Sequence, residues 1–361
     1  MVNNNVFGRT LNPHKLTLTA GGSSGGEGAL VAMRGSILGV GTDIGGSIRI
    51  PALCCGTYGF KPSANRIPYG GQQGPGRAGS PGIVAAAGPL ATTFRDLEFF
   101  VKHVISRIPQ DYDSTALAIP WVEVEPKKKL TIGILPEDPQ FPLHPPVSRA
   151  LATAVDILRT AGHTIVPLAG SPRISESDTI VRPFFSLDNT KTPFKHIAAS
   201  GEPMIPSVKK TLYIVDAKPR GYTLEELYDL NVARASYTER WNEVFVNNKL
   251  DVLLAPGAEN TAVPHDTYGN APYTGVWNLL NYPGVMIPFL KADKSVDKDD
   301  LFPAESSRKY CAADVDGAPC SIQLVSRNLR DESLLAAASI VSDVLEKYAK
   351  REGKSQYKQR L

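Results

Sequence analysis

The chain has 361 residues, 42% of them hydrophobic and 21% charged, with a formal net charge of +3. A chain of this length and composition can bury a large core, so we expect it to be globular rather than disordered. The small net charge and the short basic runs at 127–129 and 347–351 argue against a protein that binds nucleic acid or a membrane surface.

Cysteine and histidine spacing and the N-terminal residues indicate the cellular compartment and whether a metal site is expected. The four cysteines, without CxxC or zinc-finger spacing, fit buried thiols in a reducing compartment better than a disulfide framework. The six histidines form no HxxxH or HxH pair, so we expect no metal site. Residues 1–5 are polar and unlike a signal peptide, and no apolar stretch reaches the ~18 residues of a membrane-spanning helix. We therefore expect a soluble, cytoplasmic protein.

In the first part of the chain, short periodic segments alternate with glycine-rich loops. Residues 1–20 indicate a short strand and a loop. A helix is predicted over 27–33, because an acidic residue lies in its first turn and apolar residues follow. Residues 37–41 are predicted as a buried strand, and residues 70–82, rich in Gly, Pro and Gln, as a surface loop.

Strands and helices alternate in the rest of the chain. Helices are predicted over 92–104, 147–161 and 223–247. Strands are predicted over 129–135, 163–166 and 251–255, with a loop from there to Pro288. This order predicts one α/β domain, 1–361, in which helices cover a parallel or mixed sheet.

Two serines lie in glycine-rich runs: Ser23 in residues 21–28 (GGSSGGEG) and Ser47 in residues 41–49 (GTDIGGSIR). Glycines beside a serine let the backbone come close to a substrate and turn its N–H groups inward. A hydrolase that forms a tetrahedral oxyanion needs such donors next to its nucleophile. The runs therefore predict a serine hydrolase, although Ser23 also fits the N-cap of the predicted 27–33 helix.

At these residues the sequence resembles the amidase-signature family of serine hydrolases, most closely its fungal acetamidase-like and fatty-acid-amide-hydrolase-like members. The other landmarks of the resemblance are 4–10 (NNVFGRT), 59–63 (GFKPS), 66–71 (RIPYGG), 88–91 (GPLA), 316–319 (DGAP), 323–325 (QLV) and 330–332 (RDE). The resemblance implies an α/β/α sandwich with a mixed central sheet. It also implies the hydrolysis of small-molecule carboxylic amides without a cofactor.

The family uses a Ser–Ser–Lys triad. By motif position, the resemblance implies that Ser47 is the nucleophile and that Ser23 is the bridging serine, on a cis peptide. The N–H groups implied as oxyanion-hole donors are those of Ile44, Gly45, Gly46 and Ser47. The residues expected to support the two loops are Ser24, Asp43 and Arg49, the last two by ion pairing or by hydrogen bonds to the backbone.

The resemblance also implies a lysine on a strand well upstream of Ser23. Met1 lies too close to Ser23 for this, Lys61 belongs to the GFKP motif that the family keeps for structure, and Lys15 follows a polar segment. We therefore expect an N-terminally truncated domain without the catalytic lysine, and a catalytically impaired paralogue that retains the fold remains an alternative. The unpaired sheet edge of such a domain would favour homo-oligomers or an N-terminal partner segment.

Another class of hydrolase fits residues 22–26, which match the G-x-S-x-G nucleophile elbow of α/β-hydrolases with Ser24 as the nucleophile. The apolar segment before it and the helix after it would give the strand–turn–helix context, with Asp251 and His265 as the triad partners. This interpretation leaves the loop around Ser47 unexplained. The G-x-G-x-x-G match at 74–79 lies in a predicted loop and does not indicate a dinucleotide site.

Overall fold

The computed structural model describes residues 2–359 except 75, 81, 212–217, 219, 307 and 308. Positions 75 and 81 of the predicted 70–82 loop thus lie outside the described residues, and the rest of that segment contains no helix or strand, as predicted. Among the described residues, no helix combines the length and apolar character needed to cross a membrane.

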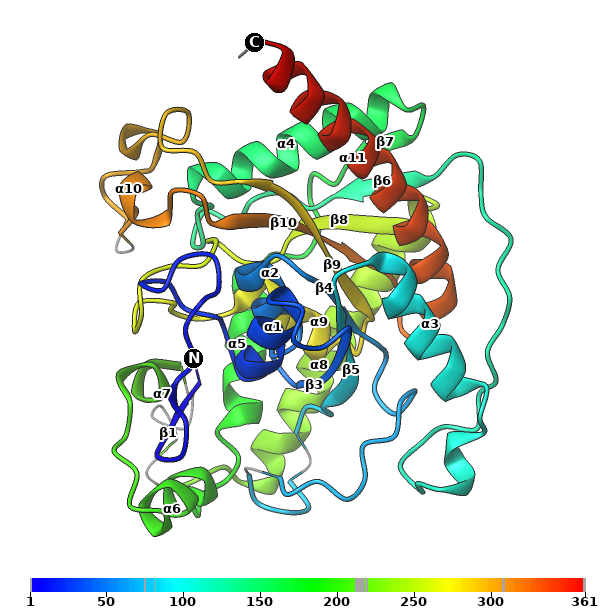
Figure 1. Ribbon diagram of the computed structural model, residues 1–361. Coiled ribbons are helices and arrows are strands. Elements are labelled where there is room, and N and C mark those ends of the chain that lie inside the picture. Colours follow the sequence, from blue (N-terminus) through cyan, green and yellow to red (C-terminus); the bar gives the residue numbers. More distant parts are fainter. Residues whose placement is uncertain are drawn as a thin grey trace.

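An eight-stranded mixed sheet forms the centre of the fold (Figure 1). In spatial order its strands are β3 (Leu38–Asp43), β5 (Ala86–Ala91), β4 (Tyr58–Lys61), β9 (Gly284–Lys291), β10 (Pro319–Val325), β8 (Val252–Pro256), β6 (Thr131–Ile134) and β7 (Thr164–Pro167). Strand β6 is parallel to β7 and β8, and the other neighbours are antiparallel. The prediction of a mixed sheet is therefore confirmed. Near the N-terminus, β1 (Asn3–Asn4) pairs with β2 (Gly8–Arg9).

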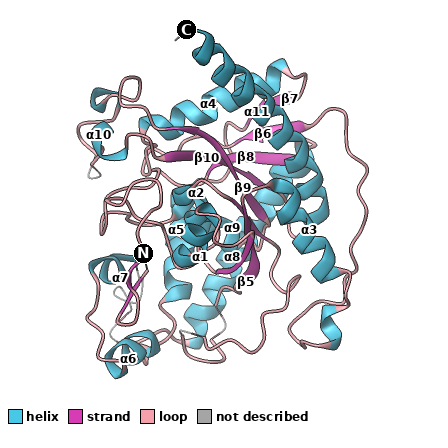
Figure 2. Ribbon diagram, in the orientation of Figure 1, coloured by secondary structure: helices cyan, strands magenta, loops and turns pink. Residues whose placement is uncertain are grey.

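Helices cover both faces of this sheet (Figure 2). Those on one face are α3 (Phe94–Ile105), α4 (Pro145–Thr160) and α11 (Asp331–Gln359). Those on the other are α1 (Gly25–Ala32), α2 (Arg49–Cys55), α5 (Ile174–Phe185), α8 (Leu224–Asn247) and α9 (Pro272–Leu279). The shorter elements are α6 (Thr192–Ala199), α7 (Pro206–Thr211), α10 (Ala312–Val315) and two 3-10 turns, Pro109–Asp111 and Asp299–Leu301. The α/β/α sandwich is thus confirmed.

Local sequence explains why two of the long helices, α3 and α8, form where they were predicted. Helix α3 buries Leu97, Val101 and Ile105 on one stripe, and the Thr93 side chain caps it by accepting the Asp96 N–H at 3.2 Å. Helix α8 begins with a capping box between Thr223 and Glu226. A cap and an apolar stripe together specify a helix well enough to be recognised from sequence.

The predicted loop from residue 256 to Pro288 is wrong, because this segment contains helix α9 and the first part of strand β9. Every residue of α9 is buried, so the helix has no polar face and lacks the periodicity of an amphipathic helix. Strand β9 lies between β4 and β10 inside the sheet, and its first four residues are buried. A buried strand of this kind lacks the alternation that marks a half-exposed one.

Two burial predictions also need correction. Strand β3 is not fully buried, because it is an edge strand of the sheet and Val40 is 50% exposed. The thiols of Cys54, Cys55 and Cys320 are buried as expected, whereas Cys311 is exposed. Burial raises the pKa of Cys55 and of Cys320 to about 12, so both thiols stay protonated at neutral pH.

Side chains of α1 partly cover the outer edge of β3. The Glu27 carboxylate accepts the Val40 N–H at 3.3 Å, and the Ser24 hydroxyl accepts the Thr42 N–H at 3.2 Å. The approach is close, because a Cβ on Gly41 would lie 2.6 Å from Ser24 Oγ. Side chains of α1 and of the residue just before it therefore bind the outward N–H groups of Val40 and Thr42, which another strand could otherwise bind.

The same edge still exposes apolar side chains, and this predicts self-association. Ile37 is 77% exposed, Val40 50%, and Met33 of the adjoining helix 62%. We expect the purified chain to form oligomers or aggregates in sedimentation velocity, and we expect Val40→Lys to shift it toward monomer because a charged edge disfavours strand addition. The control is Val232→Lys on α8, where the valine is 69% exposed but lies outside the sheet. A wild-type chain that remains monomeric at high concentration would refute the prediction.

Candidate active site

Ser23 and Ser47 lie in two loops that the fold brings side by side. The Gly22–Ser23 peptide bond is cis, as the resemblance implied, and lies just before α1. Ser47 lies in the loop that joins β3 to α2. The backbone N–H of Ser24 donates to the carbonyl oxygen of Ser47 at 3.1 Å, which links the two loops directly.

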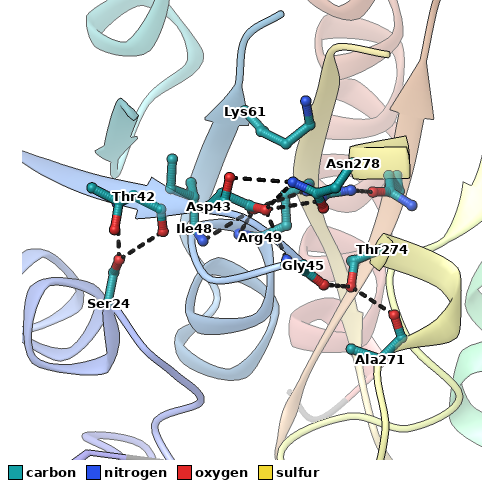
Figure 3. Close-up of polar contacts among 12 residues, drawn as sticks. Ser24, Thr42, Asp43, Gly45, Ile48, Arg49, Lys61, Ala271, Thr274 and Asn278 are labelled. Atoms are coloured by element: carbon teal, nitrogen blue, oxygen red, sulfur yellow. Dashed lines mark hydrogen bonds and ion pairs between the residues drawn. The ribbon is translucent and has the colours of Figure 1, made fainter. Parts of the chain in front are cut away.

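Ser24 also ties its loop to the strand that leads to Ser47. Its hydroxyl accepts the Thr42 N–H at 3.2 Å and donates to the Thr42 carbonyl oxygen at 3.4 Å (Figure 3). Ser24, and not Ser23, occupies the N-cap position of α1, but its side chain makes no capping hydrogen bond. The alternative of Ser23 as the helix N-cap is therefore wrong, and Ser24 has the supporting contacts that were expected of it.

The Asp43 carboxylate holds the Ser47 loop through hydrogen bonds to its backbone and to Arg49. Its oxygens accept the backbone N–H of Gly46 at 2.7 Å and that of Ile48 at 3.2 Å. They also accept Nε and Nη2 of Arg49, both at 3.0 Å, in a bidentate pair (Figure 3). Both side chains are 0% exposed. Asp43 and Arg49 thus form both the ion pair and the backbone hydrogen bonds expected of them.

Burial alone would raise the pKa of Asp43, because a carboxylate loses its hydration inside the protein. The Arg49 charge and its hydrogen bonds outweigh this effect and lower the pKa to about 2, with help from Lys61 and Asn278. Asp43 is therefore ionised at neutral pH and acts as an acceptor rather than as a proton carrier.

The contact between Gly46 and Asp43 changes the predicted oxyanion hole. An N–H that donates at 2.7 Å to a buried carboxylate is no longer available to a substrate oxygen. Of the four N–H groups that the resemblance implied as donors, that of Gly46 is bound to Asp43, and those of Ile44, Gly45 and Ser47 remain candidates.

Three residues around this loop were given no role from the sequence: Thr274, Asn278 and Gln323, the last of which appeared only as part of the 323–325 landmark. Thr274 on α9 donates its hydroxyl hydrogen to the Gly45 carbonyl oxygen at 2.7 Å, and Asn278 donates to the Asp43 carboxylate at 3.0 Å. Gln323 on β10 accepts from Arg49 Nη1 at 2.9 Å. Thr274 and Asn278 lie in the segment predicted as a loop, so no helical spacing marked them as one face.

Lys15 and Lys61, the two lysines considered as the base, lie in different parts of the structure. Lys15 donates its amine to the carbonyl oxygens of Ala313 at 3.0 Å and Asp314 at 2.7 Å. Lys61 is 1% exposed and donates to the Pro62 carbonyl oxygen at 3.0 Å. Figure 3 shows its amine pointing away from the Asp43–Arg49 pair. Burial, assisted by the Arg49 charge, lowers the pKa of Lys61 to about 7.

The residues nominated for a nucleophile elbow do not come together. Asp251 pairs with Lys127 at 2.5 Å and accepts the Thr131 N–H at 2.8 Å, while the His265 ring contacts the Leu16 carbonyl oxygen at 2.9 Å. Residues 16–19 form only isolated bridges, so the strand expected before the elbow is absent from this described segment. The elbow interpretation of Ser24 lacks both its strand and its triad.

Removing the charge of Asp43 should destabilise the protein, because Asp43→Asn leaves Arg49 buried without a counter-ion. We expect a loss of about 3–5 kcal/mol in the free energy of unfolding at pH 7, measured by urea denaturation. The folded-state pKa is depressed, so the contribution of the pair is present above pH ~5 and is lost as the pH falls toward 2. The difference between wild type and Asp43→Asn should narrow over that range.

The matched control is Asp156→Asn, which removes the exposed pair between Asp156 and Arg159. An exposed pair contributes about 0–1 kcal/mol, so this variant should unfold almost as the wild type does. Equal stability of the Asp43 and Asp156 variants at pH 7 would show that the buried pair does not hold the loop.

Comparison with known proteins assigns the family. The family model Amidase matches residues 2–335. An amidase of Gibberella moniliformis is 42% identical over 350 residues, which are 95% of this chain and 63% of that protein. An acetamidase of Aspergillus oryzae is 35% identical, covering 95% of this chain and 66% of that protein. A solved structure of a fatty acid amide hydrolase superposes with a TM-score of 0.89 at 33% identity, over 95% of this chain and 62% of the other. The chain thus spans just under two thirds of the length of these relatives, and it belongs to the amidase family.

Proposed function

We propose that this chain carries the nucleophile and the oxyanion-binding loop of a hydrolase that cleaves carboxylic amides. The observation that supports the proposal best is the junction of the two serine loops, through the hydrogen bond from the Ser24 N–H to the Ser47 carbonyl oxygen. A nucleophile and a relay serine must be held close together for a proton to pass between them.

In the proposed mechanism, Ser47 Oγ attacks the amide carbonyl carbon and its proton passes through Ser23 to a base. The oxyanion that forms accepts hydrogen bonds from the N–H groups of Ile44, Gly45 and Ser47, and one such donor typically stabilises a transition state by about 3–4 kcal/mol. The base returns the proton to the leaving nitrogen as the C–N bond breaks. Water then hydrolyses the acyl-enzyme at the same carbon and frees Ser47.

We infer that the base is a neutral lysine that comes from outside residues 1–361. Lys61 has a suitable pKa of about 7, but its amine is directed away from the Asp43–Arg49 pair, and Lys15 donates to carbonyl oxygens near α10. A general base must be within hydrogen-bond reach of the proton it takes, and the contacts of these two amines support a base other than Lys15 or Lys61.

The names of the relatives support amides as the substrate class, because amidase, acetamidase and fatty acid amide hydrolase all describe the cleavage of an amide C–N bond. The proposed chemistry needs no metal or cofactor. The buried, protonated thiols of Cys55 and Cys320 are compatible with the cytoplasmic location that we propose.

Covalent labelling tests the nucleophile. A serine-directed fluorophosphonate should form an adduct at Ser47, identified by peptide mass spectrometry, and Ser47→Ala should abolish it. Ser24→Ala is the matched control, because it keeps the nucleophile and removes only supporting contacts. An adduct on Ser24 would favour the elbow mechanism, and a folded wild-type chain without any adduct would favour an impaired paralogue.

Turnover tests the base. We expect the purified chain to hydrolyse simple amides on the order of 10²–10⁴-fold more slowly than a relative that retains its lysine, which is the range that general bases contribute. Lys61→Met and Lys15→Met should leave the residual rate unchanged. Hydrolysis at the rate of the relative, lost in either variant, would show that the base lies within this chain.

A further inference from the structure

Both ends of one peptide unit in the candidate oxyanion loop are held by side chains. The Gly45–Gly46 peptide presents its carbonyl oxygen to the Thr274 hydroxyl, which donates to it at 2.7 Å. The N–H of the same peptide, on Gly46, donates to Asp43 Oδ1, also at 2.7 Å. The C=O and N–H of a trans peptide point in opposite directions. Thr274 and Asp43 therefore form hydrogen bonds to this peptide from opposite sides.

This peptide is intrinsically the one most able to rotate. Glycine on each side removes the Cβ atoms that normally restrict the flanking φ and ψ angles. Gly46 has φ +135, a conformation that other residues rarely adopt, and a Cβ there would lie 2.3 Å from Thr274 Oγ1. The glycines that permit the loop conformation therefore do not by themselves fix it.

Rotation of this unit would harm the proposed chemistry. The flanking N–H groups of Gly45 and Ser47 are among the proposed donors to the oxyanion. A turn of about 180° would exchange the two ends of the unit, so that the Gly45 carbonyl oxygen would face the Asp43 carboxylate and the Gly46 N–H would lose its acceptor. Relieving that repulsion would displace the backbone around Gly45 and Ser47, whose N–H groups the oxyanion needs. Of the two side chains that bind this peptide, Asp43 lies next to the same loop in sequence, whereas Thr274 lies on the separate helix α9.

Helix α9 is a firm support for this contact. Every one of its residues is buried, and Asn278, one turn after Thr274 on the same face, donates to the Asp43 carbonyl oxygen at 3.2 Å and to the Asp43 carboxylate at 3.0 Å. The Thr274 hydroxyl also lies 3.2 Å from the Ala271 carbonyl oxygen. A hydroxyl has a single hydrogen to donate, and the shorter contact to Gly45 takes it.

We propose that Thr274 is a positioning residue of the amide hydrolase, which together with Asp43 fixes the orientation of the Gly45–Gly46 peptide so that the N–H groups of Gly45 and Ser47 keep facing the substrate. This inference rests on the proposed function. It assigns to Thr274 no contact with the substrate, and it predicts an effect on the rate of the chemical step rather than on binding.

Thr274→Val, which keeps the shape of the side chain and removes the hydroxyl, tests the rate. We expect the maximal rate of fluorophosphonate labelling at Ser47 to fall on the order of tenfold or more, below the 10²–10³-fold of an outright donor deletion. The reagent concentration for half-maximal rate should stay within about twofold. Thr274→Ser, which keeps the hydroxyl, should restore the rate.

Thr57→Val is the matched control, since Thr57 is 1% exposed and its hydroxyl has no hydrogen-bond partner within the described part of the chain. This variant should label as the wild type does. Equal labelling rates for Thr274→Val and wild type would overturn the proposal. A fall that Thr274→Ser fails to restore would do the same.

Hydrogen exchange measured by mass spectrometry separates this inference from the proposed function, because it does not depend on reactivity. The peptide covering residues 44–48 should exchange at least tenfold faster in Thr274→Val than in wild type, Thr274→Ser or Thr57→Val. Unchanged exchange would refute the positioning role even if Ser47 is labelled. Faster exchange in a chain that never labels would support the positioning role and refute the hydrolase.

Discussion

The buried ion pair between Asp43 and Arg49 is the interaction on which the candidate site depends. Two charges that are 0% exposed are tolerated only if nearly all of their hydrogen-bonding positions are used. The Asp43 carboxylate accepts hydrogen bonds from backbone N–H groups of the loop and from Arg49. The Arg49 guanidinium also donates hydrogen bonds to the side chains of Asn278 and Gln323. Because these partners lie on β3, α2, α9 and β10, satisfying the pair fixes four elements relative to one another.

Close packing around β3 provides the second constraint. The strand presents Gly41 toward α1, and the missing side chain lets Ser24 reach the backbone of Thr42. The same serine donates its N–H to the Ser47 carbonyl oxygen. The segment from Ser23 to Ser47 is therefore a compact helix–strand unit, in which the helix start and the loop after the strand meet because the backbones approach closely.

The features of this site that depend on residues close together in the sequence were predictable. The contacts between residues far apart in the sequence were not. The glycine runs, the supporting place of Asp43 and Arg49, and the helices with caps and apolar stripes all follow from neighbouring residues. Thr274, Asn278 and Gln323 contribute their hydrogen bonds from elements that are buried throughout, where no periodicity marks a face. The contact of the Gly46 N–H with Asp43 could not be predicted, because a motif names the residues of a loop but does not say which N–H groups the protein itself binds.

Sequence separation explains why the loop geometry is a property of the whole fold. Thr274 contacts Gly45 across 229 positions, Asn278 contacts Arg49 across 229, and Gln323 contacts Arg49 across 274. Contacts this distant form only once the chain between them is ordered, since loop closure costs entropy that local structure does not repay. The orientation of the peptide groups around Ser47 therefore depends on contacts with α9 and β10, which lie far along the chain. The two serines proposed to react, Ser23 and Ser47, thus lie in one short segment, and residues far along the chain on α9 and β10 hold the loop around Ser47.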